Sequence, residues 1–274
     1  MVKKNKNIKT NHRFLDEAGD TTFYGKGKRS AIGTEGVSNC FMLGMVKFYD
    51  PLETIRQQVR KLQQDIADNP LFETASLLKK KNSGGGYYFH ATDDIAEVRL
   101  KFFEYIKTLN CTFEVVVGRK NIERYETKHK GREEYFYADM LSHLLKNKLA
   151  KGEKFILHIS ERGKSTKNHN LDLALRKAEQ RYKQKKGETS EVKTKVIFNV
   201  NYPTLDPLLN VADYLCWAVQ RVFERGEMRY YNFLKEKISL VIDVYDVSKY
   251  EKWGNYYSPK NPLTVENKIS PPLH

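Results

Sequence analysis

The sequence is poor in cysteine and has no long apolar run. Its three cysteines are widely spaced among apolar residues, which argues against a disulfide framework or a zinc site and is typical of core thiols in a reducing compartment. No stretch approaches the roughly 18 apolar residues of a membrane-spanning helix. The basic N-terminus is followed by no apolar segment of the kind that a secretory signal carries. We therefore expect a cytoplasmic protein without a membrane partner.

Acidic residues are also scarce relative to basic ones. The chain has 34 Asp and Glu against 48 Lys and Arg, which gives a net charge of +14. Such an excess attracts polyanions, because Lys and Arg neutralise backbone phosphates. A basic surface can equally serve solubility alone. The charge therefore indicates nucleic acid, either DNA or RNA, as a partner but does not establish it.

Apolar periodicity predicts an α/β chain in which strands alternate with helices. The expected strands are residues 12–17, 39–49, 111–120, 154–162, 193–202 and 238–246, the last being either a strand or an extension of a helix. The expected helices are residues 50–70, 93–109, 132–150, 170–186 and 207–225. We divide the chain into a basic tail at 1–11, one domain with insertions at 12–246 and a C-terminal extension at 247–274.

The stretch HRFLDEAGD, residues 12–20, places three carboxylates at the end of the first expected strand. Buried carboxylates need a cationic partner or a metal ion, and Asp16 is the principal candidate for a ligand. Glu17 points to the other side of a regular strand, so it is either an accessory acid or the partner of a Lys or Arg. Asp20 is either a further ligand or an acid that forms a turn with Gly19.

Two acids far along the chain extend this pattern. Glu161 follows a strand and shares its face, by the two-residue period, with Phe155, Leu157 and Ile159. Asp213 lies about two turns into the helix 207–225, among mostly apolar neighbours. A carboxylate there is either bonded to a Lys, an Arg or a backbone group, or is a metal ligand or catalytic base.

Carboxylates on separated strand ends and on a late helix are the layout of the ribonuclease H-like fold. Four motifs in order, FLDEAGD, YFHATDD, ILHISERG and NVADYLCWAVQR, also resemble the bacterial family called "domain of unknown function 3800", which is regarded as ribonuclease H-like. The resemblance covers roughly residues 12–246. It implies a mixed central sheet flanked by helices, with helical additions. Ala18 stands where the family usually has Ser, and Asn210 where Gln is common.

The resemblance implies a catalytic set of Asp16, Glu161, Asp213 and His90, with Glu17 in the opening motif. The first three of these would bind Mg²⁺ or Mn²⁺, which prefer oxygen ligands and can clamp an in-line phosphodiester displacement. His90 could position water, move a proton, contact phosphate, or be structural.

Three other residues are expected to lie outside the site. Asp93 and Asp94 are most simply the N-terminal cap of the following helix. His158 lies on its strand opposite Glu161, so it is left out of the site.

The expected function is that of a metal-dependent nuclease, a hydrolase that acts in defence or in a toxin-like system. The alternative is a catalytically silent nucleic-acid-binding protein on the same fold, in which Lys or Arg pairs with the acids. A weaker alternative is action on a phosphorylated small molecule.

Overall fold

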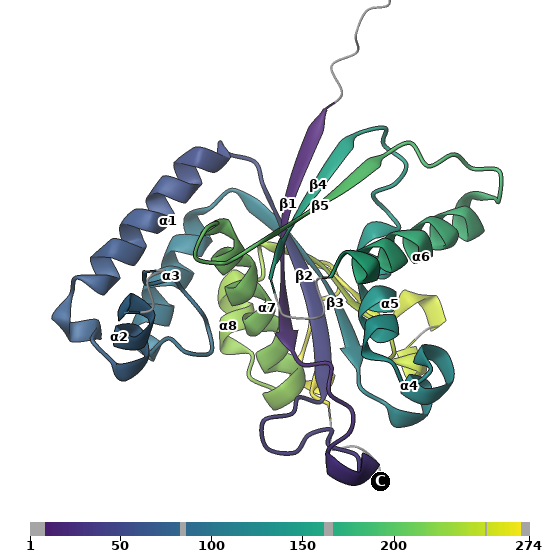
Figure 1. Cartoon of the computed structure of the whole chain (residues 1–274), viewed down its shortest axis with the longest axis horizontal. Coiled ribbons are helices and arrows are strands. Elements are labelled where there is room, and N and C mark those ends of the chain that lie inside the picture. Colours follow the sequence, from purple (N-terminus) through teal and green to yellow (C-terminus); the bar gives the residue numbers. More distant parts are fainter. Residues whose placement is uncertain (1–8, 83–85, 162–166, 250, 270–274) are drawn as a thin grey trace, which may run out of the picture.

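A single mixed β-sheet forms the centre of the computed structural model, which describes residues 9–82, 86–161, 167–249 and 251–269. In these residues seven strands lie in the order β5-β4-β1-β2-β3-β6-β7 (Figure 1). Their bounds are Thr10–Gly19 for β1, Cys40–Phe48 for β2, Cys111–Arg119 for β3, Lys154–Ser160 for β4, Lys195–Asn201 for β5, Ile238–Asp243 for β6 and Tyr256–Tyr257 for β7. The predicted α/β fold with a mixed sheet flanked by helices is confirmed.

The strand directions bring three strand ends together. The consecutive strands β1, β2 and β3 are antiparallel, whereas β4 runs parallel to β1 and β5 runs parallel to β4. On the other side, β6 is parallel to β3 and β7 is antiparallel to β6. Because β1, β4 and β5 run in the same direction, their carboxyl ends meet at one end of the sheet.

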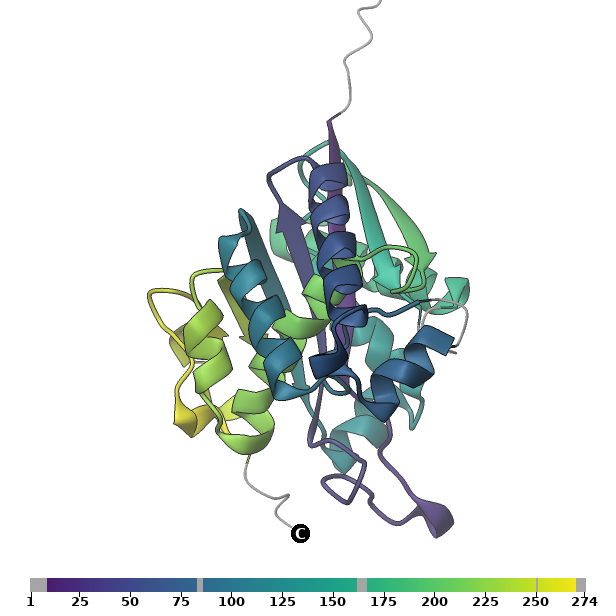
Figure 2. The same cartoon turned by 90° about the vertical axis from the view of Figure 1, so that its left-hand side faces the viewer.

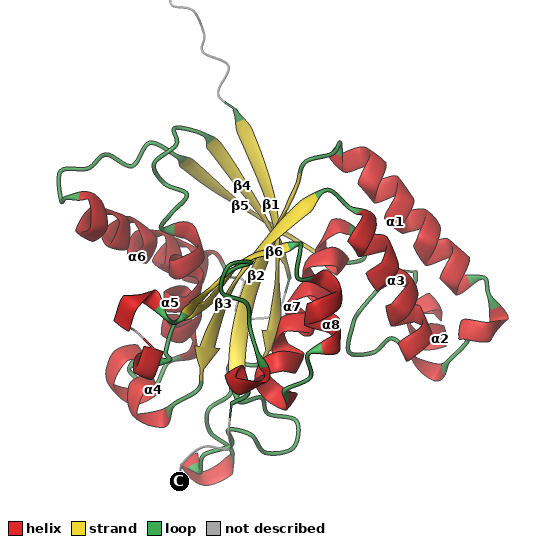
Figure 3. Cartoon of the chain, turned by 180° about the vertical axis from the view of Figure 1, so that it is seen from behind, coloured by secondary structure: helices red, strands yellow, loops and turns green. Residues whose placement is uncertain are grey.

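Helices cover both faces of the sheet (Figures 1 and 2), and Figure 3 shows the same layers from behind. One face carries α1 (Leu52–Ala67), α2 (Ala75–Asn82), α3 (Ala96–Thr108), α7 (Leu208–Arg225) and α8 (Arg229–Leu234). The other face carries α4 (Ile122–His129), α5 (Glu133–Leu145) and α6 (Asn168–Lys186). A separate cluster of buried apolar side chains fills the space on each face.

Helix α7 lies directly on the centre of the sheet because residue 44 is glycine. Gly44 is paired with Asp16 across β1 and β2. A Cβ at this position would lie 2.5 Å from Cys216 Sγ and 2.3 Å from the Phe113 ring, well inside van der Waals contact. The Cys216 thiol instead donates a hydrogen bond to the Asp16 carbonyl at 3.3 Å. Since Cys216 follows Asp213 by three residues, this contact places Asp213 over β1.

Three short helices were not expected from the sequence. Helix α2 forms in a lysine-rich stretch and buries only Leu77 and Lys80. Helices α4 and α8 are similarly short and bury few residues. One or two turns of helix give too little periodicity to separate them from a loop.

Both ends of the described chain join the body. Strand β1 begins at Thr10, so its first two residues come from the segment expected to be a basic tail. Near the other end, β7 extends the sheet and Leu263 is buried, with its N–H donating to Tyr231 Oη at 3.1 Å. In the described part of the chain, no helix has both the length and the apolar character that a membrane span requires.

Candidate active site

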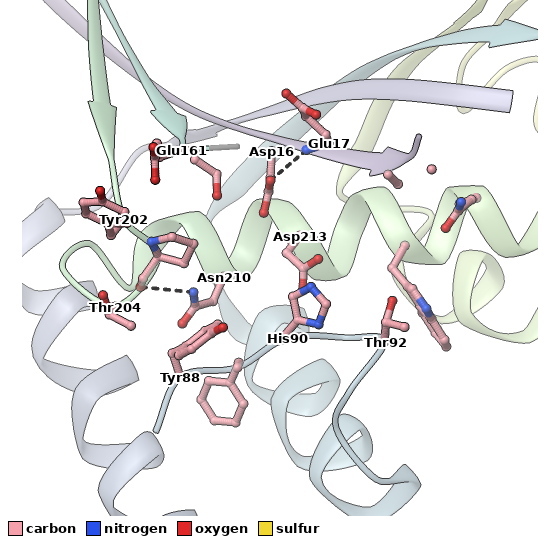
Figure 4. Close-up of a pocket in the computed structure, with 17 residues that line it drawn as sticks. Asp16, Glu17, Tyr88, His90, Thr92, Glu161, Tyr202, Thr204, Asn210 and Asp213 are labelled. Carbon is pink, nitrogen blue, oxygen red and sulfur yellow. Dashed lines mark hydrogen bonds between the residues drawn. The ribbon is translucent and has the colours of Figure 1, made fainter. Parts of the chain in front are cut away.

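A cavity of about 480 Å³ opens at the carboxyl ends of β1 and β4. Its wall is formed by these strand ends, by Tyr202 and the residues after it, by the loop around His90 and by one side of α7 (Figure 4). The predicted residues Asp16, Glu161, Asp213 and His90 all line it. Side chains far apart in the sequence are therefore brought to one cavity.

Asp16 reaches the cavity from the middle of the sheet. It is half-buried, and its Oδ1 accepts a hydrogen bond from the Glu17 N–H at 2.8 Å. By the alternation of side chains along β1, Asp16 shares a face with Phe14 and Ala18, which pack in the cluster beneath α7. In Figure 4 the Asp16 side chain points from β1 toward α7, which carries Asp213.

Asp213 is a buried acid with a single bond to the backbone. Its side chain is nearly inaccessible, at 8% exposure, and its Oδ2 accepts a hydrogen bond from the Ala91 N–H at 2.7 Å. Among the described residues it has no ion pair with a Lys or Arg. Burial is the main cause that raises the pKa of Asp213 from 3.8 to about 7, and the negative charge of Asp94 adds to the effect.

Asp94 organises the loop that holds Asp213, a role that the sequence did not indicate. It is buried and accepts hydrogen bonds from Tyr87 Oη at 3.0 Å, Tyr214 Oη at 2.6 Å and the His90 N–H at 2.8 Å. The predicted helix-capping role is wrong, because α3 begins at Ala96 and Asp94 instead closes the turn that starts at His90. This turn presents the Ala91 N–H to Asp213.

Lys80 of α2 contacts the same loop. Lys80 Nζ lies 3.4 Å from Asp94 Oδ1 and 3.7 Å from Asp93 Oδ2, and it donates to the Tyr88 carbonyl at 3.2 Å. Its positive charge lowers the pKa of Asp213, but less than burial raises it. The Lys80 ammonium therefore offsets only part of the negative charge on this side of the cavity.

Glu161 reaches the cavity for a different reason from the one predicted. The face of β4 that carries Phe155, Leu157 and Ile159 packs with the α5 side of the sheet, opposite Asp16. The strand ends at Ser160, so the alternation of side chains between the two faces of β4 no longer fixes the direction of the Glu161 side chain. Its N–H donates to the Asn201 carbonyl at 2.9 Å, and its exposed side chain points toward α7 in Figure 4.

His90 lies on the cavity wall beside the loop residue that binds Asp213. Its side chain is 40% exposed, and its Nδ1 is 3.1 Å from Asp93 Oδ2. The imidazole is therefore accessible from the cavity and adjoins a carboxylate, as a group that moves a proton would be.

The two accessory candidates differ in position. Glu17 is buried and lies on the opposite side of β1 from Asp16 (Figure 4), as the strand alternation predicts. Asp20 lies outside this cavity. Burial tends to raise its pKa, but hydrogen bonds from Lys120 and Ser38 outweigh burial and lower it. Because Asp20 Oδ1 also accepts from the Thr22 N–H at 2.8 Å, Asp20 closes a turn after β1.

The carboxylates line one cavity but do not form a compact ligand cluster. Within the described residues, no group of three or more His, Cys, Asp or Glu side chains is arranged closely enough to hold a metal ion. Mg²⁺ in proteins is often held by only one or two carboxylates together with water and substrate phosphate. The donor set therefore fits a site completed by substrate, and the three-carboxylate site stays a prediction.

The cavity continues along α7 into a second cavity of about 550 Å³. The two share Gly19, Thr92, Trp217 and Gln220. The second cavity also reaches the exposed Arg225 near the end of α7. The two cavities are therefore adjacent along one side of α7, and we call the pair the channel.

No family model matches the sequence, and no curated protein matches it. The resemblance to the family therefore rests on the four motifs alone.

Proposed function

We propose that this protein is a metal-dependent nuclease that hydrolyses phosphodiester bonds in nucleic acid. The observation that carries the proposal is that Asp16 in β1, Glu161 directly after β4 and Asp213 on α7 line a single cavity. Three acids that are separate in the sequence meet where the chain could bind a cation and a phosphate together.

The environment of Asp213 supports this proposal. A buried carboxylate with a pKa of about 7 is only partly ionised at neutral pH. A divalent cation in the cavity would favour the ionised form and offset the repulsion from Asp94. The Ala91 N–H is a backbone partner of the kind that a structural aspartate would have, but among the described residues no Lys or Arg forms an ion pair that neutralises the charge of Asp213.

We also propose that the fold is ribonuclease H-like. The antiparallel strands β1, β2 and β3, with β4 and β5 added parallel to β1, give the mixed sheet that the resemblance implies. Helix α7 rests on β1 and presents Asp213 to the strand that carries Asp16. Asp16 inside β1, Glu161 directly after β4 and Asp213 on α7 support this assignment, although β1 continues past Asp16 to Gly19.

The proposed chemistry assigns a role to each side chain. Asp16, Glu161 and Asp213 line one cavity but are not close enough to hold an ion by themselves, so they would hold Mg²⁺ or Mn²⁺ together with water and the substrate phosphate. When bound, the ion would supply a water nucleophile and neutralise charge on the phosphate. The exposed imidazole of His90 would move a proton to or from the reacting water or the leaving oxygen. Burial of Asp213 on the side of α7 that faces the sheet keeps bulk water from its carboxylate, which would strengthen its interaction with a cation.

The shape and charge of the protein favour a polymer over a small phosphorylated molecule. The channel along α7 extends beyond the acids, whereas a small molecule would be enclosed by the first cavity alone. The net charge of +14 would attract a polyanion from solution. A nucleic-acid strand lying in the channel would pass directly over Asp16 and Asp213.

A cleavage assay tests the proposal. Labelled single-stranded and duplex DNA and RNA are incubated with the protein and Mg²⁺ or Mn²⁺. We expect at least one substrate to be cut, and Asp16→Asn to lower the rate by about a hundredfold or more. The control variant Asp172→Asn makes the same change at an exposed position on α6.

The control should retain the rate of the unmodified protein. If none of the substrates is cut, the nuclease proposal is wrong. Salt-dependent binding of the same substrates without cleavage would instead favour the catalytically silent nucleic-acid-binding protein.

A further inference from the structure

A small polar cavity of about 200 Å³ lies on the other face of the sheet from the acids. Asn11 and Arg13 of β1 line it, together with Lys47 of β2. These side chains lie on the same face of their strands as Leu15 and Met45, which pack in the cluster beneath α5. Asp16 lies on the opposite face of β1. At this end of the α5-covered face, apolar side chains are thus replaced by charged ones.

Arg13 is the buried cation of this cavity. It is 6% exposed, and its Nη1 donates to Asn11 Oδ1 and to the His12 carbonyl. Among the described residues no carboxylate forms an ion pair with it, and no acceptor meets its Nε or Nη2. Burial lowers the pKa of Arg13, although Glu114 partly offsets this effect. Nε and Nη2 of Arg13 are therefore donors that an anion in the cavity could bind.

The two acids of the cavity are held by other donors. Lys148 Nζ contacts both carboxylate oxygens of Glu114 at 2.7 Å, and Asn11 Nδ2 donates to Glu153 at 2.8 Å. Within the described residues, Lys47 and Lys151 line the cavity without an ion pair to either acid. The cavity therefore keeps an excess of positive charge.

The positive charge of the cavity also lowers the pKa of Tyr49, whose phenol lies on the cavity wall. A hydrogen bond with Thr112 is the main cause that lowers the pKa of Tyr49, and the charges of Lys47 and Arg13 lower it further against the effect of burial. Lys47 Nζ lies 4.2 Å from the centre of the Tyr49 ring. The cavity thus favours a negative charge on a neutral side chain, as it would on a bound anion.

We propose that this cavity binds a phosphate group, with Arg13 as the main donor and Lys47 and Lys151 as further cations. A cavity of about 200 Å³ has room for a tetrahedral phosphate. Arg13 would donate from Nε and Nη2 to two phosphate oxygens, the paired geometry that guanidinium favours. The site is independent of the proposed nuclease centre on the other face.

Phosphate binding by the full-length protein tests this proposal. Isothermal titration and thermal unfolding are run with sodium phosphate, with sodium chloride at equal ionic strength as the reference. We expect saturable binding of phosphate and a rise in melting temperature that chloride does not reproduce. Arg13→Gln should weaken binding about ten- to hundredfold, as expected for lost hydrogen bonds to a charged group.

A double variant tests the site in case Arg13→Gln does not fold, and a control variant tests whether the loss of any lysine weakens binding. Lys47→Ala with Lys151→Ala alters side chains at the rim, so it should fold even if Arg13→Gln does not, and it should weaken phosphate binding severalfold. The control Lys61→Ala removes an exposed lysine on α1, on the other face of the sheet, and should leave binding unchanged.

Oligonucleotides with and without a 5′-phosphate distinguish the source of the group. Binding of inorganic phosphate indicates a free anion as ligand, whereas binding of only the phosphorylated oligonucleotide indicates the end of a nucleic acid. If neither probe binds, or if binding is the same in the double variant as in the unmodified protein, the proposal is wrong.

Discussion

Replacing Asp213 with asparagine should stabilise the metal-free protein at alkaline pH. The asparagine side chain has nearly the same size as aspartate, and its carbonyl oxygen can still accept the hydrogen bond from the Ala91 N–H. The substitution removes only the charge, which is buried and lies near Asp94. We expect the gain because a buried carboxylate that no cation neutralises is destabilising when it is ionised.

The magnitude follows from the pKa of Asp213. Burial raises it from 3.8 to about 7, and this difference corresponds to about 4 kcal/mol. Between these two values the folded protein keeps the proton that the unfolded chain has lost, so stability falls as pH rises through this window. Above pH 7 the ionised Asp213 lowers the free energy of unfolding by this full amount, and the asparagine variant, which cannot ionise, does not lose it.

Urea unfolding in the presence of a chelator measures the effect. At pH 8 we expect Asp213→Asn to be more stable than the unmodified protein by about 4 kcal/mol, and at pH 5 by about 2 kcal/mol or less. Asp172→Asn should show no such difference. A variant that is no more stable at pH 8, or a gap that is the same at both pH values, would refute the reasoning.

Two further substitutions test how α7 is positioned. Tyr214→Phe removes the hydroxyl that donates to Asp94 at 2.6 Å, and urea unfolding should show a loss of about 2 kcal/mol; an unchanged midpoint would contradict the role of this bond. Gly44→Ala places a methyl group against Cys216 and Phe113, and thermal unfolding should show a loss of about 1–3 kcal/mol; an unchanged melting temperature would mean that α7 does not lie this close.

The elements with strong periodicity were predictable from the sequence. The apolar run of β2 and the long helix α7 lie within one or two residues of their expected bounds, because burial imposes a clear pattern on such segments. The meeting of Asp16, Glu161 and Asp213 at one cavity was also anticipated. The parallel pairing of β1 with β4, and the packing of α7 on β1, bring these three acids to the same end of the sheet.

The remaining features depend on contacts between distant segments. The role of Asp94 requires the Tyr214 hydroxyl from α7, and nothing in the local sequence indicates that pairing. The orientation of Glu161 depends on where β4 stops, and a shift of one residue reverses the face to which a strand residue points. Short helices such as α2 form because the surrounding structure holds them, and their own residues give little signal.

The most direct test of the proposed metal centre is calorimetric titration of chelator-treated protein with Mn²⁺ and Mg²⁺. Unmodified protein should bind the ion, and Asp16→Asn and Asp213→Asn should each weaken binding by about tenfold or more, since each removes a charged ligand. Asp172→Asn should bind as the unmodified protein does. Absence of binding by the unmodified protein, or equal affinity in all four proteins, would contradict the metal site.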